Sequence, residues 1–186
     1  MIPETSPTPT QPSTALVWLY LLVCQAGWFL CVLGAARGIG WVGMSFAVAV
    51  VIAHLWRCAE PWRELRFIST AVVIGWLWES ALVHAGLLVY PHFANVLGLA
   101  PYWLAGLWAL FAIQFNILLV WLRGRYGLAA LLGAVAGPLS FRAGAALGAV
   151  QFPQPWPALL TLSLGWTVLM PLMVTLSTRW DGVKRH

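Results

Sequence analysis

Six apolar segments, each of about twenty residues, occupy most of this sequence. A helix of about 20 apolar residues crosses the roughly 30 Å of hydrocarbon in a bilayer, whereas the strands of a membrane β-barrel are about half as long. Only 8% of the residues are charged, against about 25% in soluble domains. We therefore expect an all-α polytopic integral membrane protein with six transmembrane helices, at residues 15–36, 38–56, 67–90, 101–122, 127–150 and 157–178.

The six segments form one predicted transmembrane domain, residues 15–178, between two polar tails. Residues 1–14 are rich in proline and threonine and contain no Lys or Arg. They lack the basic start of a signal peptide, so we expect a flexible tail that leads into an uncleaved first helix. Residues 179–186 form a basic tail.

The positions of the basic residues predict how the chain is oriented in the membrane. Only Arg37 follows the first segment, whereas the connections after the second, fourth and sixth segments carry the other loop cations. Cytoplasmic loops are enriched in Lys and Arg, so both termini are expected to be cytoplasmic. The net charge of +5 is thus explained by topology, and no nucleic-acid partner is expected. The cations of these three connections are Arg57, Arg63, Arg66, Arg123, Arg125, Arg179, Lys184 and Arg185.

Two charged residues, Glu79 and Arg142, fall inside the predicted spans, at similar predicted depths. A lone charge at the centre of a membrane helix costs about 2.5–3.5 kcal/mol on insertion scales, so such residues usually face the interior and pair. Two interpretations stay open. The residues form an ion pair that fixes how two helices dock, or Glu79 belongs to a proton or substrate site.

Other polar residues complete a candidate intramembrane polar site. His84 is five residues after Glu79, which places the two about 140° apart around a helix, so a relay between them is poorly aligned. Ser140 lacks the G-x-S-x-G context of a serine nucleophile. No spacing of His, Cys or carboxylates suggests a metal site, and no cofactor is expected. The candidate site consists of Glu79, Arg142, His84, Ser140, Gln25, Gln114 and Asn116.

Glycine and tryptophan mark the expected packing of the bundle. Gly133, Gly137, Gly144 and Gly148 place small residues along the fifth segment, where a neighbouring helix can approach closely. That neighbour is another helix of the chain or a second copy. Five tryptophans lie away from the predicted membrane interfaces and are expected to pack or to line an apolar cavity. They are Trp28, Trp76, Trp78, Trp108 and Trp166.

Three blocks of sequence resemble a small bacterial inner-membrane family, the domain of unknown function 2878. They are Gly27-Trp28-Phe29 with Cys31 to Gly34, Ala100 to Trp103 with Leu107 to Ala112, and Gly137 to Phe141 with Ala143-Gly144 and Leu147 to Ala149. The resemblance covers about residues 16–178, although this chain has Arg142 where an aromatic residue is expected. It implies the bacterial inner membrane and an association with envelope-lipid modification genes, and it assigns no catalytic residue.

Three functions are compatible with these features. The leading hypothesis is a non-catalytic membrane protein that binds lipid or a partner subunit, because few polar groups are present to perform chemistry. Its partners would be membrane lipids, another membrane protein or a second copy. The alternatives are an intramembrane enzyme that acts on acyl lipids and a proton-coupled small-solute transporter that uses Glu79.

Overall fold

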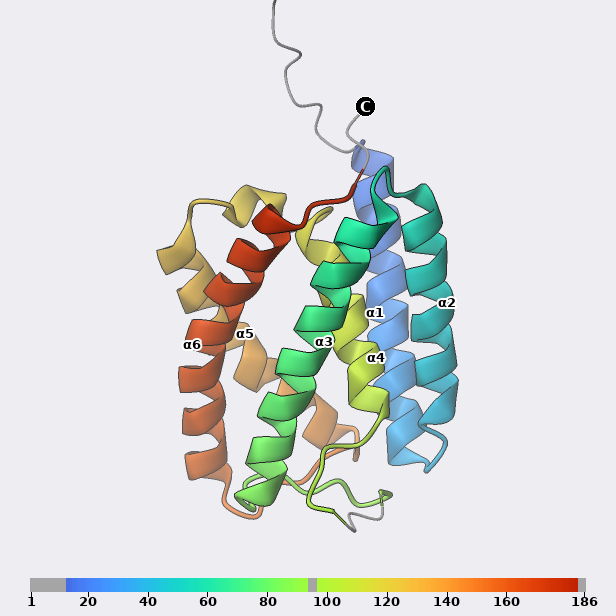
Figure 1. Ribbon diagram of the computed structural model, residues 1–186. Helices are drawn as coiled ribbons and strands as arrows, with labels where there is room; N and C mark the ends of the chain where they lie inside the picture. The colour runs from blue at the N-terminus through green and yellow to red at the C-terminus, as the bar shows by residue number, and fades with distance from the viewer. Residues whose placement is uncertain (1–12, 94–96, 184–186) are drawn as a thin grey trace, which may run out of the picture.

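A computed structural model describes residues 13–93 and 97–183. Most of the predicted tail 1–14, together with Lys184 and Arg185, lies outside the described residues. The described chain folds into α-helices joined by short connections (Figure 1). These elements are α1 (Thr14–Ala36), α2 (Trp41–Arg57), α3 (Pro61–His84), α4 (Trp103–Phe115), the short 3-10 helix η1 (Val120–Leu122), α5 (Tyr126–Ala146) and α6 (Pro155–Arg179).

Four of the described helices, α1, α3, α5 and α6, are long and apolar enough to cross a membrane. The all-α class and the membrane class are thereby confirmed. The apolar helices α2 and α4 are shorter, with 17 and 13 residues. Thirteen residues of helix extend about 20 Å, less than the thickness of the hydrocarbon layer. The six-span count therefore stays a prediction.

The helix α4 ends at Phe115, seven residues before the end of the predicted span at residue 122. The next residue, Asn116, uses its side chain to bind Glu64 and Arg123. The backbone then turns, because the amides of Leu118 and Leu119 both donate to the carbonyl of Gln114, at 2.7 and 3.0 Å. A polar side chain with partners outside the helix therefore ends an apolar run that length alone predicts to continue.

The helix α3 begins at Pro61, six residues before the predicted span. Proline is favoured in the first turn of a helix because its missing N–H has no helical partner there. Buried residues then recur every three or four positions, as expected for one buried face of an α-helix. This face carries one carboxylate near each end, Glu64 and Glu79. Its buried members include Glu64, Phe67, Ile68, Ala71, Gly75 and Glu79.

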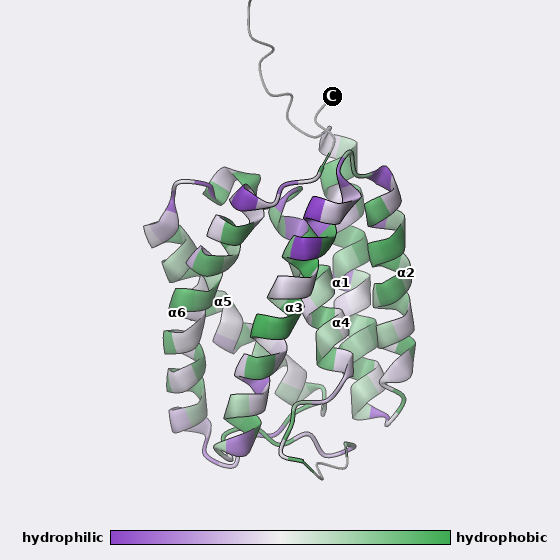
Figure 2. Cartoon of the chain, viewed as in Figure 1, coloured by the Kyte–Doolittle hydropathy of each residue, from purple (hydrophilic) through white to green (hydrophobic). Residues whose placement is uncertain are grey.

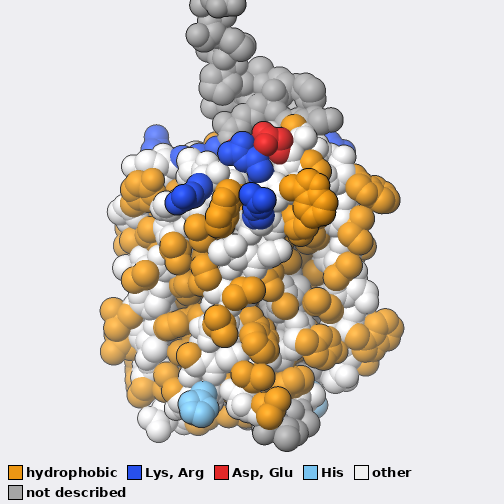
Figure 3. Space-filling model, in the orientation of Figure 1, with side chains coloured by type: hydrophobic (Ala, Val, Ile, Leu, Met, Phe, Trp, Pro, Cys, Tyr) orange, Lys and Arg blue, Asp and Glu red, His pale blue; other side chains and the backbone are white. Residues whose placement is uncertain are grey.

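The helices alternate in direction, and α4 packs against α1, α2 and α3 while α5 packs mainly against α6 (Figure 1). Both ends of the described chain lie at the same end of the bundle. Figure 3 shows Arg side chains gathered at that end of the visible face, above a largely apolar flank. Figure 2 shows the same division: hydrophilic residues gather at that end, and the middle of the bundle is mostly hydrophobic. We call this end of the molecule the basic end.

A stack of indole rings and glycines joins the two parts of the bundle. The rings of Trp108 in α4 and Trp166 in α6 lie parallel, with centroids 5.2 Å apart and an interplanar angle of 10°. Gly75 of α3 lies directly against Trp108, and Gly137 of α5 lies directly against Trp166. Four helices thus meet through two stacked rings, and a side chain at either glycine would overlap an indole.

Two of the four predicted packing glycines, Gly133 and Gly137, lie on α5 and face α6. Gly133 lies against the backbone of Trp166, and Gly137 lies against its ring. Gly144 is buried near Val150, and a β-carbon at this glycine would lie 3.7 Å from that side chain. Gly148 follows the helix and has a φ of +85°, a conformation that favours glycine. The helix that closely approaches Gly133 and Gly137 is therefore α6 of the same chain.

Candidate functional site

The carboxyl group of Glu79 lies inside the bundle, and the side chain is 1% exposed. It interacts with the hydroxyl of Tyr90, in the connection after α3, and with the indole of Trp108 in α4. The Glu79 Oε2 atom and the Tyr90 hydroxyl nevertheless lack a well-formed hydrogen bond. Burial raises the pKa of Tyr90 well above its ordinary value, and Glu79 adds to this shift. The Tyr90 hydroxyl thus keeps its proton.

Glu79 lines a cavity of about 130 Å³ between α1, α3, α4, α5 and α6. Two other predicted site residues, Gln114 and Ser140, also line it. The Ser140 hydroxyl accepts a hydrogen bond from the Trp28 indole at 3.2 Å, and Gln114 donates to the carbonyl of Leu110 at 3.0 Å. Of the five deep tryptophans, Trp28, Trp108 and Trp166 contribute to the wall. We call this space the Glu79 cavity.

The structure places the other four predicted site residues elsewhere. Arg142 is exposed four residues before the end of α5, and the described part of the chain contains no ion pair between it and Glu79. Gln25 is exposed on α1, and His84 is exposed at the end of α3. Asn116 is buried, but it belongs to a different cluster. Because Arg142 lies near the end of α5, its long side chain can extend towards the membrane interface.

The arrangement around Ser140 does not suit nucleophilic catalysis. A serine nucleophile needs a base within hydrogen-bond reach. No histidine is among the residues that line the Glu79 cavity, and His84 is exposed at the end of α3. Among the described residues there is no group of three or more His, Cys, Asp and Glu side chains able to hold a metal ion. The described lining of the Glu79 cavity therefore supplies no histidine base for Ser140.

A second buried polar cluster surrounds Glu64, which is 0% exposed near the start of α3. Its Oε1 atom is 3.1 Å from Nε2 of His54 in α2, and the other ring nitrogen of His54 is 2.6 Å from the Tyr20 hydroxyl in α1. Its Oε2 atom accepts hydrogen bonds from Asn116 at 2.8 Å and from the backbone amide of Gly182 at 3.0 Å. Glu64 therefore joins three helices to the C-terminal segment.

Arg123 extends this cluster to the basic end of the bundle. It donates to Asn116 at 2.7 Å and forms an ion pair with Asp181 at 2.9 Å. Burial lowers the pKa of Arg123, and the negative charge of Glu64 opposes this effect. We call the residues Tyr20, His54, Glu64, Asn116, Arg123 and Asp181 the Glu64 cluster.

Sequence reasoning missed most of the Glu64 cluster, because it placed Glu64 and Arg123 in the connections between the predicted spans. A signal was present. Glu64 lies three and four residues before Phe67 and Ile68, and it therefore continues the apolar face of the next helix. A carboxylate in phase with such a face is expected to turn inwards with it.

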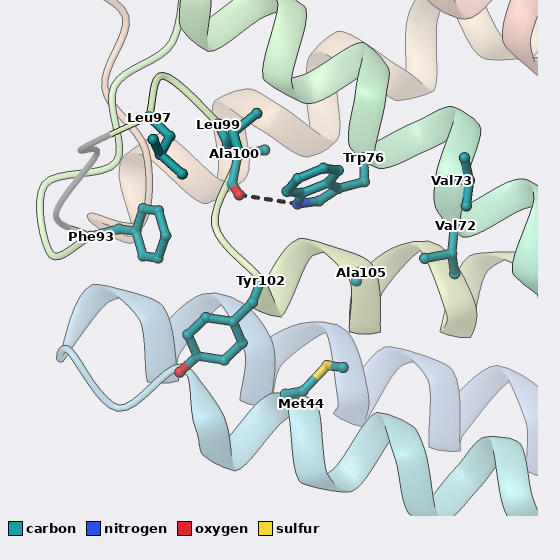
Figure 4. Close-up of a pocket in the computed structure, with 10 residues that line it drawn as sticks. All are labelled: Met44, Val72, Val73, Trp76, Phe93, Leu97, Leu99, Ala100, Tyr102 and Ala105. Carbon is teal, nitrogen blue, oxygen red and sulfur yellow. Dashed lines mark hydrogen bonds between the residues drawn. The ribbon is translucent and has the colours of Figure 1, made fainter.

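The third feature is an apolar groove of about 500 Å³ between α2 and α3, with α4 as its floor (Figure 4). Trp76 lies across it, and its indole donates a hydrogen bond of 3.0 Å to the carbonyl of Ala100. Ala105 forms part of the floor, and Tyr102 lies at the edge. The lining contains no charged side chain and consists of Met44, Val72, Val73, Trp76, Phe93, Leu97, Leu99, Ala100, Tyr102 and Ala105.

The comparison with known families gives one match. The model of the family described as "Protein of unknown function (DUF2878)" matches residues 17–172. This range covers nearly the whole predicted transmembrane domain. It includes the Glu79 cavity, the apolar groove and every residue of the Glu64 cluster except Asp181. No curated protein and no solved structure matches the chain.

Proposed function

We propose that this chain, which belongs to the DUF2878 family, is a non-catalytic membrane protein that binds the acyl chain of a membrane lipid. The apolar groove between α2 and α3 carries the proposal. Ligand sites usually have volumes of about 300–1,000 Å³ and mainly apolar walls. The groove has about 500 Å³ and only apolar or aromatic lining residues, so it matches an acyl chain better than a polar metabolite.

The position of the groove supports a lipid as its occupant. α2 and α3 both pack against α4 but contact each other little, and the groove lies where they separate. Val73 and Leu97 are exposed beside it, so the groove is open along the flank of the bundle. A flank of this composition faces acyl chains when the protein is in a bilayer. The nearest molecules able to enter are therefore lipids.

The predicted topology favours one leaflet for the groove. Met44 and Ala105 lie near the starts of α2 and α4, at the end of the bundle opposite the basic end. If the basic end is cytoplasmic, as the loop cations predict, the groove opens to the outer leaflet. We propose that the protein resides in a bacterial inner membrane, that both termini are cytoplasmic, and that Tyr102 marks the level of the lipid headgroup.

Transport through Glu79 has less support. The buried face of α3 between Glu64 and Glu79 carries Phe67, Ile68, Ala71 and Gly75, and 15 residues of helix separate the carboxylates by about 22 Å. Among the described residues, no side-chain hydrogen bond joins Glu64, His54 or Asn116 to a residue that lines the Glu79 cavity. These residues therefore provide no hydrogen-bonded proton path from one carboxylate to the other.

The test is selective lipid retention. The protein is purified in mild detergent, mixed with a defined set of phospholipids, and studied by native mass spectrometry. Ala105→Phe fills the floor of the groove and should lower lipid retention about tenfold, as expected for the loss of several buried methylene contacts. Ala53→Phe makes the same change at an exposed position on α2 and should leave retention unchanged.

The proposal fails if the wild-type protein retains no lipid after detergent exchange, or if both phenylalanine variants retain lipid equally well. Thermal unfolding of the two variants shows whether each is folded. If Ala105→Phe is unstable, Val73→Trp narrows the groove from its exposed edge and provides the same test.

A further inference from the structure

The lining of the Glu79 cavity, unlike that of the acyl-chain groove, includes a carboxyl group. The cavity lining includes Glu79 and Trp166. The Oε2 atom of Glu79 and the Nε1 atom of Trp166 are both buried and both lack a hydrogen-bond partner among the described residues. A buried polar group without a partner costs about 1–3 kcal/mol, so native structures rarely leave two of them at one site.

The surrounding packing holds both side chains in place. The Trp166 ring is stacked on Trp108 and rests against Gly137 on its other side. It cannot turn without breaking this stack. Glu79 interacts with Trp108 and Tyr90 through its carboxyl group. The Glu79 and Trp166 side chains are therefore held in the cavity wall by contacts that involve four helices.

The chemistry of the two atoms selects the polar group that fits. The Trp166 N–H can only donate, so its partner must accept. An ammonium group has no acceptor and would leave this N–H unpaired. An anion would meet the carboxyl group of Glu79 with no Lys, Arg or His in the lining. A neutral hydroxyl accepts from the indole and can donate to, or accept from, the carboxyl group.

The size of the cavity limits the rest of the molecule. A cavity of about 150 Å³ lined by apolar side chains holds a benzene ring, and the Glu79 cavity has about 130 Å³. Trp28 and Ser140 line it without being fully buried. A short alkyl chain or one ring fits inside, and Ser140 is exposed at the surface of the bundle.

From these observations we propose that the Glu79 cavity is a binding site for a small uncharged amphiphile whose single hydroxyl group pairs with Glu79 and Trp166. The site is separate from the acyl-chain groove and does not rest on the function proposed for that groove. A cluster of ordered waters would also pair both atoms, so the experiment distinguishes an alcohol from water.

The probe is a photoreactive diazirine derivative of octanol, and its control is the same diazirine on octane. The full-length protein is reconstituted in phosphatidylcholine vesicles, irradiated with each probe, and analysed by peptide mass spectrometry. We expect the octanol probe to label segments that line the Glu79 cavity, and unlabelled octanol, but not octane, to compete. Equal labelling by the octane probe would overturn the proposal, because the hydroxyl would then not be recognised. No labelling of these segments would also overturn it, because water alone would then occupy the site.

Two tryptophan variants make the test specific to the hydrogen bond. Trp166→Phe keeps an aromatic ring and removes the N–H, and it should weaken competition by octanol about tenfold. Trp78→Phe is the matched control, because the Trp78 N–H is also buried without a partner, but Trp78 is not among the residues that line the cavity and its ring lies against Gly165. Trp78→Phe should leave competition unchanged.

Variants of Glu79 give a second, independent measurement. Glu79→Gln keeps a donor and an acceptor and should retain most octanol binding, whereas Glu79→Leu removes both and should abolish it. If Glu79→Leu fails to fold, the Trp166→Phe and Trp78→Phe pair still decides. Equal octanol competition in that pair would overturn the proposal, even if lipid retention by the groove is observed.

Discussion

Single side chains at the basic end connect segments that are far apart in the sequence. Glu64 receives hydrogen bonds from Asn116 and from the amide of Gly182, and it also contacts His54. These partners come from α2, the end of α4 and the segment after α6. A carboxylate with several partners is stable in the interior, but removing it leaves all of its donors unpaired.

This dependence predicts a large effect of substitution at Glu64. Glu64→Ala should destabilise the protein by about 3–5 kcal/mol, the range for removing one member of a buried charged network. Glu60→Ala is the matched control, because the Glu60 side chain is 58% exposed and pairs with Arg63 at the surface, an interaction worth about 0–1 kcal/mol. Unfolding in detergent should separate the two variants. Similar midpoints would show that the Glu64 cluster does not hold the basic end together.

Pairs of helices depend on glycines that receive indole rings. Gly75 meets Trp108, Gly137 meets Trp166, and Gly165 meets Trp78. The absence of a side chain lets each ring lie flat on a helix backbone, which gives a large contact area in a bilayer where the hydrophobic effect does not drive helix association. These three glycines thus belong to contacts between helices.

A methyl group at one of these glycines should separate the helices. Gly75→Ala places a β-carbon inside the Trp108 ring, and relief of this overlap should cost about 1–3 kcal/mol. Gly127→Ala is the control, because a β-carbon at this position in the first turn of α5 would meet no atom within 4 Å. It should be neutral or stabilise by up to about 1 kcal/mol through helix propensity. Tryptophan fluorescence and thermal unfolding would report both changes, and an unchanged Gly75→Ala would contradict the stacked arrangement.

At the scale of the whole molecule, both ends of the described chain and most of the loop cations share one end of the bundle. This arrangement agrees with the alternating charge of the connections. The opposite end carries the connection between α3 and α4, where Leu97 is 78% exposed. The compartment that each end faces is predicted from the excess of Lys and Arg.

Cysteine accessibility tests this orientation. A cysteine at Leu97 should react with a membrane-impermeant thiol reagent in intact cells, and a cysteine at Glu60 should react only after the membrane is permeabilised. The three native cysteines, Cys24, Cys31 and Cys58, are buried and should give little background. The reverse pattern would place the termini outside the cytoplasm and the groove in the inner leaflet.

The sequence by itself determined the class of the protein and its family. Runs of apolar residues and the scarcity of charge are local properties, and a bilayer selects helices from them with little regard to tertiary contacts. The resemblance to the domain of unknown function 2878 is confirmed by the match over residues 17–172. Glu79 could also be selected from the sequence, because the cost of a carboxylate in hydrocarbon requires a special environment wherever the helix packs.

Only the tertiary structure decided which residues meet. Successive residues of a helix point 100° apart, so similar depth in the membrane does not place Glu79 and Arg142 on facing sides. The structure instead joins Glu79 to Trp108 and Tyr90, and it exposes Arg142. It also brings Glu64, Asn116 and Arg123 together from segments up to 59 residues apart. Contacts of this kind depend on the rotation and end point of each helix, which packing against its neighbours determines.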